Sequence, residues 1–260
     1  MPGLKDLDNI IEDTYDTGRA SSNSQHVLTN FWEPVLSEAN YLFRGVAYFT
    51  SGGLISSAKG FKRLIEKDNA KIQLLVGVDI TRDDYDAIER GHFLKADLDE
   101  IIYEKWIEIR NDLDLNEHSR FYLEVISFMI AVGILEVRVV HQIEGDFHCK
   151  YAHIKDEYGD SIVLMGSNNE SQNAIFFNSE NFSVNKSWHA DMSPTKHFER
   201  NVKNCEDWWK GIDRDKAHII EWPEACKADC IDIVDSRNIT KQKLTNQDEL
   251  RILEKLNEVS

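Results

Sequence analysis

Two strand-like segments separated by one amphipathic helix constrain the fold of this chain more than any other feature. Residues 42–49 form a β-type apolar run, and residues 71–78 (KIQLLVGV) form a second run of the kind that a sheet buries on both faces. Between them, residues 54–65 have the apolar spacing of a helix. A strand–helix–strand order is typical of a βαβ unit, so we predict an α/β fold with a largely parallel or mixed sheet.

The remaining elements are predicted from the same periodicities and from turn residues. Helices are expected at 25–40, from Thr81 to about residue 132, from the Ser193-Pro194 start to Gly211, and at 247–259. Strands are expected at 135–140, 147–154, 161–165 and 181–187. Because the pattern changes after residue 212, we predict one compact α/β domain over 1–212. Residues 213–260 are expected to form a short, helical C-terminal extension that packs on this domain or on a partner.

Composition and charge exclude several classes of protein. The 260 residues include 42% hydrophobic side chains, enough for a core, and carry a formal net charge of −16. This excess of acid argues against a protein that coats nucleic acid non-specifically, because phosphate binding needs a cationic surface. No apolar run reaches the ~18 residues that a membrane span needs. The first ten residues lack an apolar signal core, and the four cysteines form no disulfide pattern, so a cytoplasmic protein is expected.

Two short polar segments carry the chemistry. Residues 147–150 read Phe-His-Cys-Lys, and residues 166–170 read Gly-Ser-Asn-Asn-Glu. On a strand, His148 and Lys150 share one face. Two such groups side by side repel each other when both are charged, and their pairing makes sense if both converge on an anion. In the second segment, serine and asparagine side chains can hydrogen-bond phosphate oxygens, and glycine permits close approach of the backbone. Together the segments predict a phosphate site.

These segments resemble the His-x-Lys and Gly-Ser-x-Asn motifs of the phospholipase D superfamily. The resemblance extends to 45–54, 72–77 and 182–188. Over about 25–211 the chain looks like the phospholipase D-like nuclease domain at the N-terminus of bacterial DEAD/DEAH-type helicases and restriction- and defence-linked proteins. The resemblance implies a phospholipase D-like mixed β-sheet flanked by helices, and it implies a nuclease or another phosphodiester hydrolase.

The resemblance also implies roles for individual residues. His148 would be the nucleophile or the acid/base, Lys150 and Asn169 would stabilise the oxyanion, and Ser167 would donate a hydrogen bond to the phosphate. Helicase-linked members carry a glutamate at the position of Glu170, which implies that this residue orients the histidine or the lysine. The alternative is an acid at a helix start that interacts with the helix dipole. No metal or other cofactor is implied, because these side chains neutralise the phosphoryl group.

The aspartate of the superfamily motif has no direct counterpart here. Its position, counted from His148, is Lys155, and Asp156 follows in the turn, so Asp156 and Glu170 both remain candidates for that acid. A second match to the motif begins at His153, but turn residues follow His153 and Lys155 at the positions where the motif has a strand. Strand periodicity therefore favours His148 and places His153 on the opposite face.

The implied mechanism and partners follow from the same resemblance. The mechanism of the superfamily needs two histidines on opposite sides of phosphorus. This chain has one credible His-x-Lys pair, so a homodimer with a shared site is predicted. DNA is the expected substrate and RNA the alternative, with no membrane partner. A helicase or ATPase subunit is a candidate partner for 213–260. A catalytically dead binding module and a lipid phosphodiesterase are the competing hypotheses. Lys59, Lys62 and Arg63 are candidate phosphate contacts, and a solvated helix face is the more ordinary explanation.

Overall fold

The main element of the structure is one mixed β-sheet with helices on both faces. The computed structural model describes residues 2–17, 25–98, 100–111, 119–169, 171, 174, 178–192, 196–212 and 215–234. The strands are β1 (Thr14–Asp16), β2 (Tyr41–Val46), β3 (Lys71–Val76), β4 (Asp79–Thr81), β5 (Leu135–Gln142), β6 (Tyr151–Lys155), β7 (Ser161–Gly166), β8 (Asn181–Lys186), β9 (Ala217–Glu221) and β10 (Asp232–Val234). The α-helices are α2 (Glu33–Glu38), α3 (Ser51–Ser56), α4 (Ala58–Ile65), α5 (Arg82–Ala96), α6 (Glu100–Asn111), α7 (Ser119–Ala131), α9 (His197–Lys210) and α10 (Trp222–Lys227). Helical turns of other types are η1 (Leu4–Leu7), η2 (Leu28–Trp32) and η3 (Ser187–Met192).

The sheet has eight strands in the order β1-β8-β7-β6-β2-β3-β5-β9. β2, β3 and β5 run parallel to one another, and the pairs that involve β6, β7, β8 and β9 are antiparallel. β4 and β10 form a separate parallel pair. Helices connect the parallel strands, as the strand–helix–strand pattern predicts. The predicted fold class, an α/β protein with a mixed sheet flanked by helices, is confirmed.

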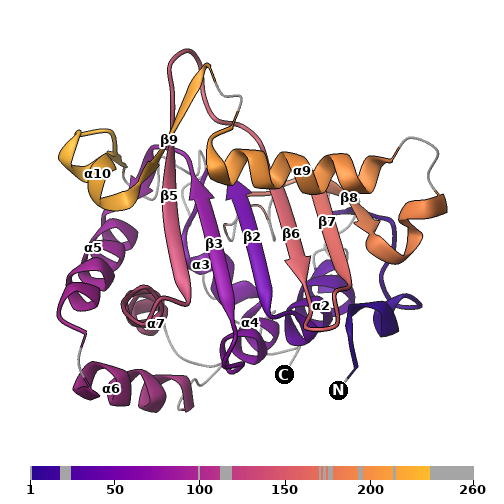
Figure 1. Ribbon diagram of the computed structural model, residues 1–260, viewed down its shortest axis with the longest axis horizontal. Coiled ribbons are helices and arrows are strands. Elements are labelled where there is room, and N and C mark those ends of the chain that lie inside the picture. Colours follow the sequence, from indigo (N-terminus) through magenta and orange to yellow (C-terminus); the bar gives the residue numbers. More distant parts are fainter. Residues whose placement is uncertain are drawn as a thin grey trace.

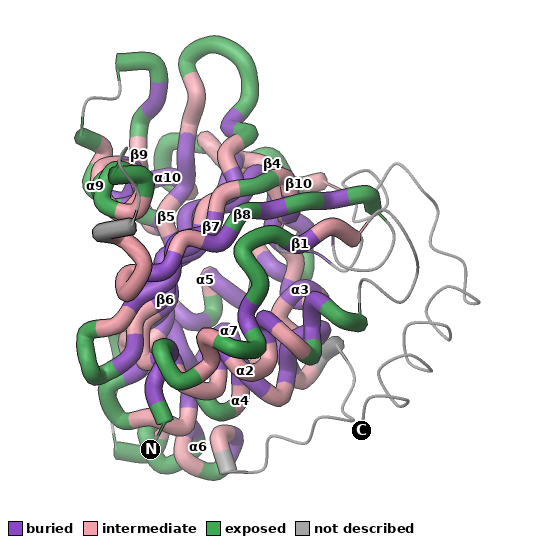
Figure 2. The backbone as a smooth tube through the Cα atoms, turned by 90° about the vertical axis from the view of Figure 1, so that its right-hand side faces the viewer, coloured by how far each residue is buried: buried purple, intermediate pink, exposed green. Residues whose placement is uncertain are grey.

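Two hydrophobic cores lie on the two faces of this sheet. The larger core packs against α2, α4, α5 and α7, and its buried side chains include Phe31, Leu42, Phe61 and Ile154. The smaller core lies beneath α9. Figure 1 shows α9 crossing one face of the sheet, and Figure 2 shows the sheet between α9 and the helices of the other face. Apolar side chains spaced along α9, as its sequence pattern predicts, therefore cover the second face.

The strand predicted to carry the His-x-Lys motif is shorter than expected and begins after it. β6 begins at Tyr151, which pairs with Gly45 of β2, and not at residue 147. The ladder with β2 ends at this pair because β2 itself ends at Val46, so residues 147–150 lead into the sheet without belonging to it. The predicted helix 54–65 is likewise two helices, α3 and α4, and the acidic region divides into α5, α6 and α7.

The segment after residue 212 contributes to the same sheet. β9 pairs with β5 from Glu221 opposite Arg138 to Ala217 opposite Gln142, and Trp222 of α10 is fully buried in the larger core. This part of the predicted extension therefore packs on the main fold. The predicted helix 247–259 and the predicted helix start at Ser193-Pro194 lie outside the described residues. Judged by length and hydropathy, the helices in the described part of the chain all fall short of a membrane span.

Candidate functional site

The two polar segments meet at one edge of the sheet. Because β2, β3 and β5 are parallel, their carboxyl ends lie at the same edge, and Figure 1 shows the arrowheads of β2 and β3 pointing to it. β6 is antiparallel to β2 and begins at this edge, and β7 ends there at Gly166. The segment that carries His148 and Lys150 therefore lies beside the loop that carries Ser167 and Asn169. Ligands of open α/β sheets bind at such carboxyl edges.

His148 and Lys150 differ in their exposure to solvent. His148 is exposed, whereas Lys150 is only 3% exposed. The Lys150 ammonium donates a hydrogen bond to the carbonyl oxygen of His148 at 2.9 Å. Burial lowers the pKa of Lys150, the charge of Glu180 raises it, and the charge of Arg44 lowers it further. The segment thus presents an imidazole to solvent and holds a desolvated ammonium directly behind it.

The loop after β7 is fixed by its backbone. The amide of Ser167 donates to the carbonyl oxygen of Asn181 at 2.9 Å, and the backbone amide of Tyr48 donates to the side-chain oxygen of Asn169 at 3.1 Å. A Cβ atom at Gly166 would lie 2.2 Å from the carbonyl oxygen of Asn181, so only glycine fits this approach of β7 to β8. The described contacts of these glycine, serine and asparagine residues are with other parts of the protein, so their predicted contacts with phosphate stay a prediction.

Among the described residues, Glu180 is the acid that contacts the motif loop, and the sequence reasoning missed it. The Ser167 hydroxyl donates a short hydrogen bond to one carboxylate oxygen of Glu180, and the side-chain amide of Asn178 donates to the other at 3.0 Å. Glu180 is 8% exposed, and its charge acts on Lys150. The sequence places Glu170 closer to the motif, whereas the antiparallel pairing of β7 with β8 brings Glu180 beside it. The register of β7 against β8 is the information that the sequence reasoning lacked.

Asp156 stabilises the fold at the edge of the sheet opposite to the candidate site. β6 ends at Lys155, opposite the first residue of β2, so Asp156 and Lys150 lie at opposite ends of this strand. The Asp156 carboxylate accepts hydrogen bonds from the backbone amides of Leu4, Tyr158 and Asp160 at 2.8, 3.0 and 2.9 Å. It therefore stabilises the β6–β7 turn and docks the N-terminal segment, and it does not reach the motif. Glu170, the other candidate, lies outside the described residues.

His153 is a core residue. It is 2% exposed and lies on β6 between Phe43 and Val163, beneath α9. Within the described residues its Nε2 atom has no hydrogen-bond partner. Burial, and to a smaller extent the charge of Lys155, lowers its pKa to about 4. Of these two histidines, His148 is therefore the one at the carboxyl edge.

Lys59, Lys62 and Arg63 do not join this site. They line a cleft of about 700 Å³ between α2 and α4, together with Glu33 and residues of both helices. Figure 1 shows α4 beside the amino end of β3, so the cleft that this helix lines lies toward the opposite edge of the sheet. Any contact of these three cations with phosphate would be remote from His148.

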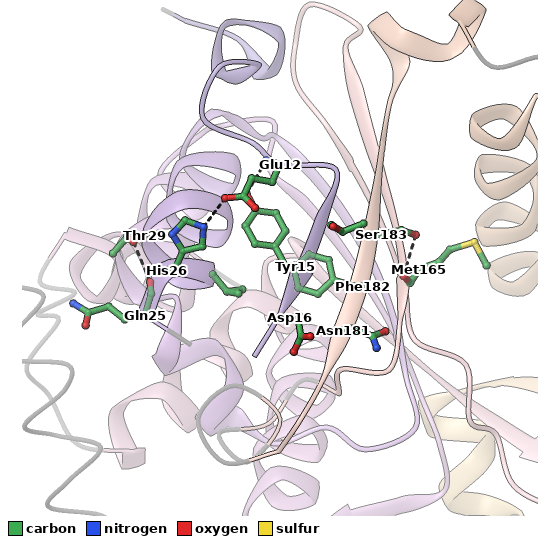
Figure 3. A pocket seen from close by; sticks show the side chains of 12 residues that line it. Glu12, Tyr15, Asp16, Gln25, His26, Thr29, Met165, Asn181, Phe182 and Ser183 are labelled. Carbon is green, nitrogen blue, oxygen red and sulfur yellow. Dashed lines mark hydrogen bonds and ion pairs between the residues drawn. The ribbon is translucent and has the colours of Figure 1, made fainter. Parts of the chain in front are cut away.

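Two hollows flank the site, and both are acidic. The one drawn in Figure 3, of about 970 Å³, lies beside β1 and β8; Glu12 pairs there with His26 at 2.7 Å, and Asp16 and Asn181 line its other side. The second, of about 470 Å³, adjoins Tyr48 and is lined by acidic side chains at Asp79, Asp146, Asp229 and Asp232. Burial raises the pKa of Asp79, and the charges of Asp232 and Asp146 raise it further.

The described lining of these two hollows includes no lysine or arginine. Within the described part of the chain, the buried cations beside the motif segments are Lys150 and Arg44, and both donate to backbone carbonyl oxygens. Among the described residues, no group of three or more histidine, cysteine, aspartate or glutamate side chains is placed to hold a metal ion.

Glu180→Gln is expected to slow the reaction of this site about 10- to 100-fold, because a charge-assisted hydrogen bond is lost. Without the carboxylate charge the pKa of Lys150 falls further, so the alkaline limb of the rate–pH profile moves to lower pH. The measurement is kcat across pH 6–10. Glu199→Gln, an exposed acid on α9, is the control. An unchanged kcat and profile in Glu180→Gln would remove this residue from the site.

Fold and side chains together define an α/β protein whose candidate site lies at the carboxyl edge of a mixed sheet. No protein-family model matches the chain, and no curated protein matches it significantly. Among solved structures, NucT from Helicobacter pylori aligns over 73% of this chain and 94% of its own, at 14% identity and a TM-score of 0.38. Polyphosphate kinase from Porphyromonas gingivalis aligns over 96% of this chain and 28% of its own, at 12% identity and a TM-score of 0.41. We therefore argue function from the side chains of the site and not from these alignments.

Proposed function

We propose that this protein is a metal-independent phosphodiesterase. The observation that supports the proposal is that the segment with an exposed imidazole and a buried ammonium lies beside the loop whose hydroxyl donates to a buried carboxylate. His148, Lys150, Ser167 and Glu180 supply these groups, and Asn169 lies in the same loop. The residue types are those of the phospholipase D-like motifs, although the Ser167 hydroxyl donates to Glu180 in this structure.

The proposed reaction has two displacements at phosphorus. A nitrogen of His148 forms a bond to phosphorus while the bond to the leaving oxygen breaks, and a second imidazole donates a proton to that oxygen. Water then loses a proton to the second imidazole and attacks phosphorus, which releases His148. Lys150 and Asn169 stabilise the negative charge on the phosphoryl oxygens, and Glu180 holds the hydroxyl of Ser167 in place.

The second imidazole is proposed to be His148 of a second copy, related by a twofold axis through the site. The proposed substrate is DNA, cleaved endonucleolytically, with a helicase or ATPase subunit as a partner in restriction or anti-phage defence. These specific assignments rest on the sequence resemblance. The acidic hollows favour a substrate that presents a single phosphate over a duplex that lies along the surface.

The test of this function is cleavage in the presence of excess EDTA. We expect unchanged rates on bis(4-nitrophenyl) phosphate and on supercoiled plasmid, since no step uses a metal ion. Quenching in alkali during turnover of a 32P-labelled oligonucleotide should trap an alkali-stable, acid-labile adduct on His148. Loss of activity in EDTA would contradict the mechanism. Parallel assays with an RNA oligonucleotide and with phosphatidylcholine vesicles distinguish the substrate classes, and inactivity on all of these substrates favours a binding module.

A further inference from the structure

Arg44 is a buried cation directly behind the candidate site. It lies in the middle of β2, is 2% exposed, and points to the same face of the sheet as Leu42 and Val46. Its guanidinium carbon lies 5.5 Å from the centroid of the Trp32 ring. Burying a guanidinium is unfavourable unless good hydrogen bonds compensate, so the bonds of Arg44 show which parts of the fold depend on it.

Two hydrogen bonds of its guanidinium reach the two motif segments. Nη1 donates to the carbonyl oxygen of Tyr151 at 3.2 Å, and Nη2 donates to the carbonyl oxygen of Asn168 at 2.8 Å. Tyr151 directly follows Lys150, and Asn168 directly precedes Asn169. The planar fork of an arginine suits such a double contact, because its donors are held in a fixed geometry.

β2 holds the same loop a second time. Beyond its last residue, the backbone amide of Tyr48 donates to the side chain of Asn169 at 3.1 Å. The loop is therefore held to the β2 segment at two points, and Arg44 is the point that also binds the segment of Lys150.

We propose that Arg44 is a positioning residue of the phosphodiester site, because it bridges the two backbone segments that carry Lys150 and Asn169 and so sets their separation. This inference rests on the function proposed above. Its charge has a second consequence: Arg44 lowers the pKa of Lys150, in the same direction as burial, while Glu180 and the thiol of Cys149 raise it.

Two substitutions separate the bridge from the charge. Arg44→Met removes both, and Arg44→Lys keeps a positive charge but loses the fork. We expect kcat to fall on the order of 10- to 100-fold in both variants, with a smaller change in KM, because small displacements of catalytic groups have effects of this size. The pKa of Lys150 is expected to rise in Arg44→Met and to return toward the wild-type value in Arg44→Lys. It is measured by NMR of ε-13C-labelled lysine, assigned with Lys150→Gln, which needs no enzymatic activity.

Arg138→Met is the matched control. Arg138 also lies over a tryptophan, with its guanidinium carbon 4.3 Å from the Trp209 ring centroid, and also donates to a backbone carbonyl, but it projects from β5 toward α9. The Arg138→Met substitution is expected to lower the melting temperature without changing the pKa of Lys150. The inference is overturned if Arg44→Met leaves that pKa unchanged, or if kcat falls no more than in Arg138→Met. If the wild-type protein cleaves no phosphodiester, the proposed function is contradicted. A change in the pKa of Lys150 in Arg44→Met would in that case still support the placement of Arg44 against Lys150.

Discussion

His148→Ala is expected to reduce phosphodiester cleavage by about a thousand-fold or more, with the fold intact. The substitution removes the nitrogen that forms the bond to phosphorus, and the remaining groups stabilise charge without supplying a nucleophile. Because His148 is exposed, its removal leaves no cavity in the core, and the melting temperature is expected to stay within a few degrees of wild type. The measurements are kcat/KM on bis(4-nitrophenyl) phosphate and the thermal unfolding curve.

The control for this variant is His197→Ala, which removes an exposed imidazole from the first residue of α9. A shared site makes a further prediction. Mixed dimers of wild-type and His148→Ala chains should be as inactive as the pure variant, because each site needs both imidazoles. Full activity of a strictly monomeric protein, established by analytical ultracentrifugation at assay concentrations, is the result that rules out the shared site.

His153 is expected to make the protein sensitive to acid. Its pKa of about 4 in the folded chain lies below the ordinary value of 6.5, so the unfolded chain binds the proton more tightly. Stability is therefore lost as the pH falls from about 6.5, and the loss is complete below about pH 4. The difference between the two pKa values corresponds to about 3 kcal/mol. The physical cause is burial of the imidazole among Phe43, Val163 and the side chains beneath α9.

His153→Leu removes the titrating group and keeps a side chain of similar size. We expect it to be at least as stable as wild type at pH 7, because the buried Nε2 atom has no partner among the described residues. Between pH 7 and pH 4 its free energy of unfolding should fall by about 3 kcal/mol less than that of wild type. Urea unfolding at several pH values measures this difference. The exposed His197→Leu should follow the wild-type curve, and parallel curves for His153→Leu and wild type would contradict the burial argument.

The parts of the fold that depend on local periodicity could be predicted from the sequence. The runs 42–49, 54–65 and 71–78 have the spacing of a strand, a helix and a strand, and they form β2, α3 with α4, and β3. The predictions of these elements succeed because alternation and helical spacing are properties of neighbouring residues. The prediction that His148 and Lys150 share one face of a strand is wrong, because both residues precede β6, His148 is exposed and Lys150 is buried.

The acid of the site could not be predicted in the same way. Proximity in the sequence favours Glu170 and Asp156, whereas pairing of β7 with β8 brings Glu180 to Ser167. Strand register depends on which faces are buried and on the length of the connecting loop, and neither is visible in one short motif. Asp156 is the opposite case. It lies next to the position where the superfamily motif has its aspartate, yet its carboxylate accepts hydrogen bonds from three backbone amides and has a structural role.

The amino-acid sequence by itself determined the alternation of strands and helices and the two polar segments, because each depends on residues within a few positions of one another. Only the tertiary structure decided that Lys150 is buried, that Ser167 donates to Glu180 and that Arg44 bonds the backbone of both segments. Those contacts join residues that lie far apart in the chain, and only the pairing of β2 with β6 and of β7 with β8 brings them together.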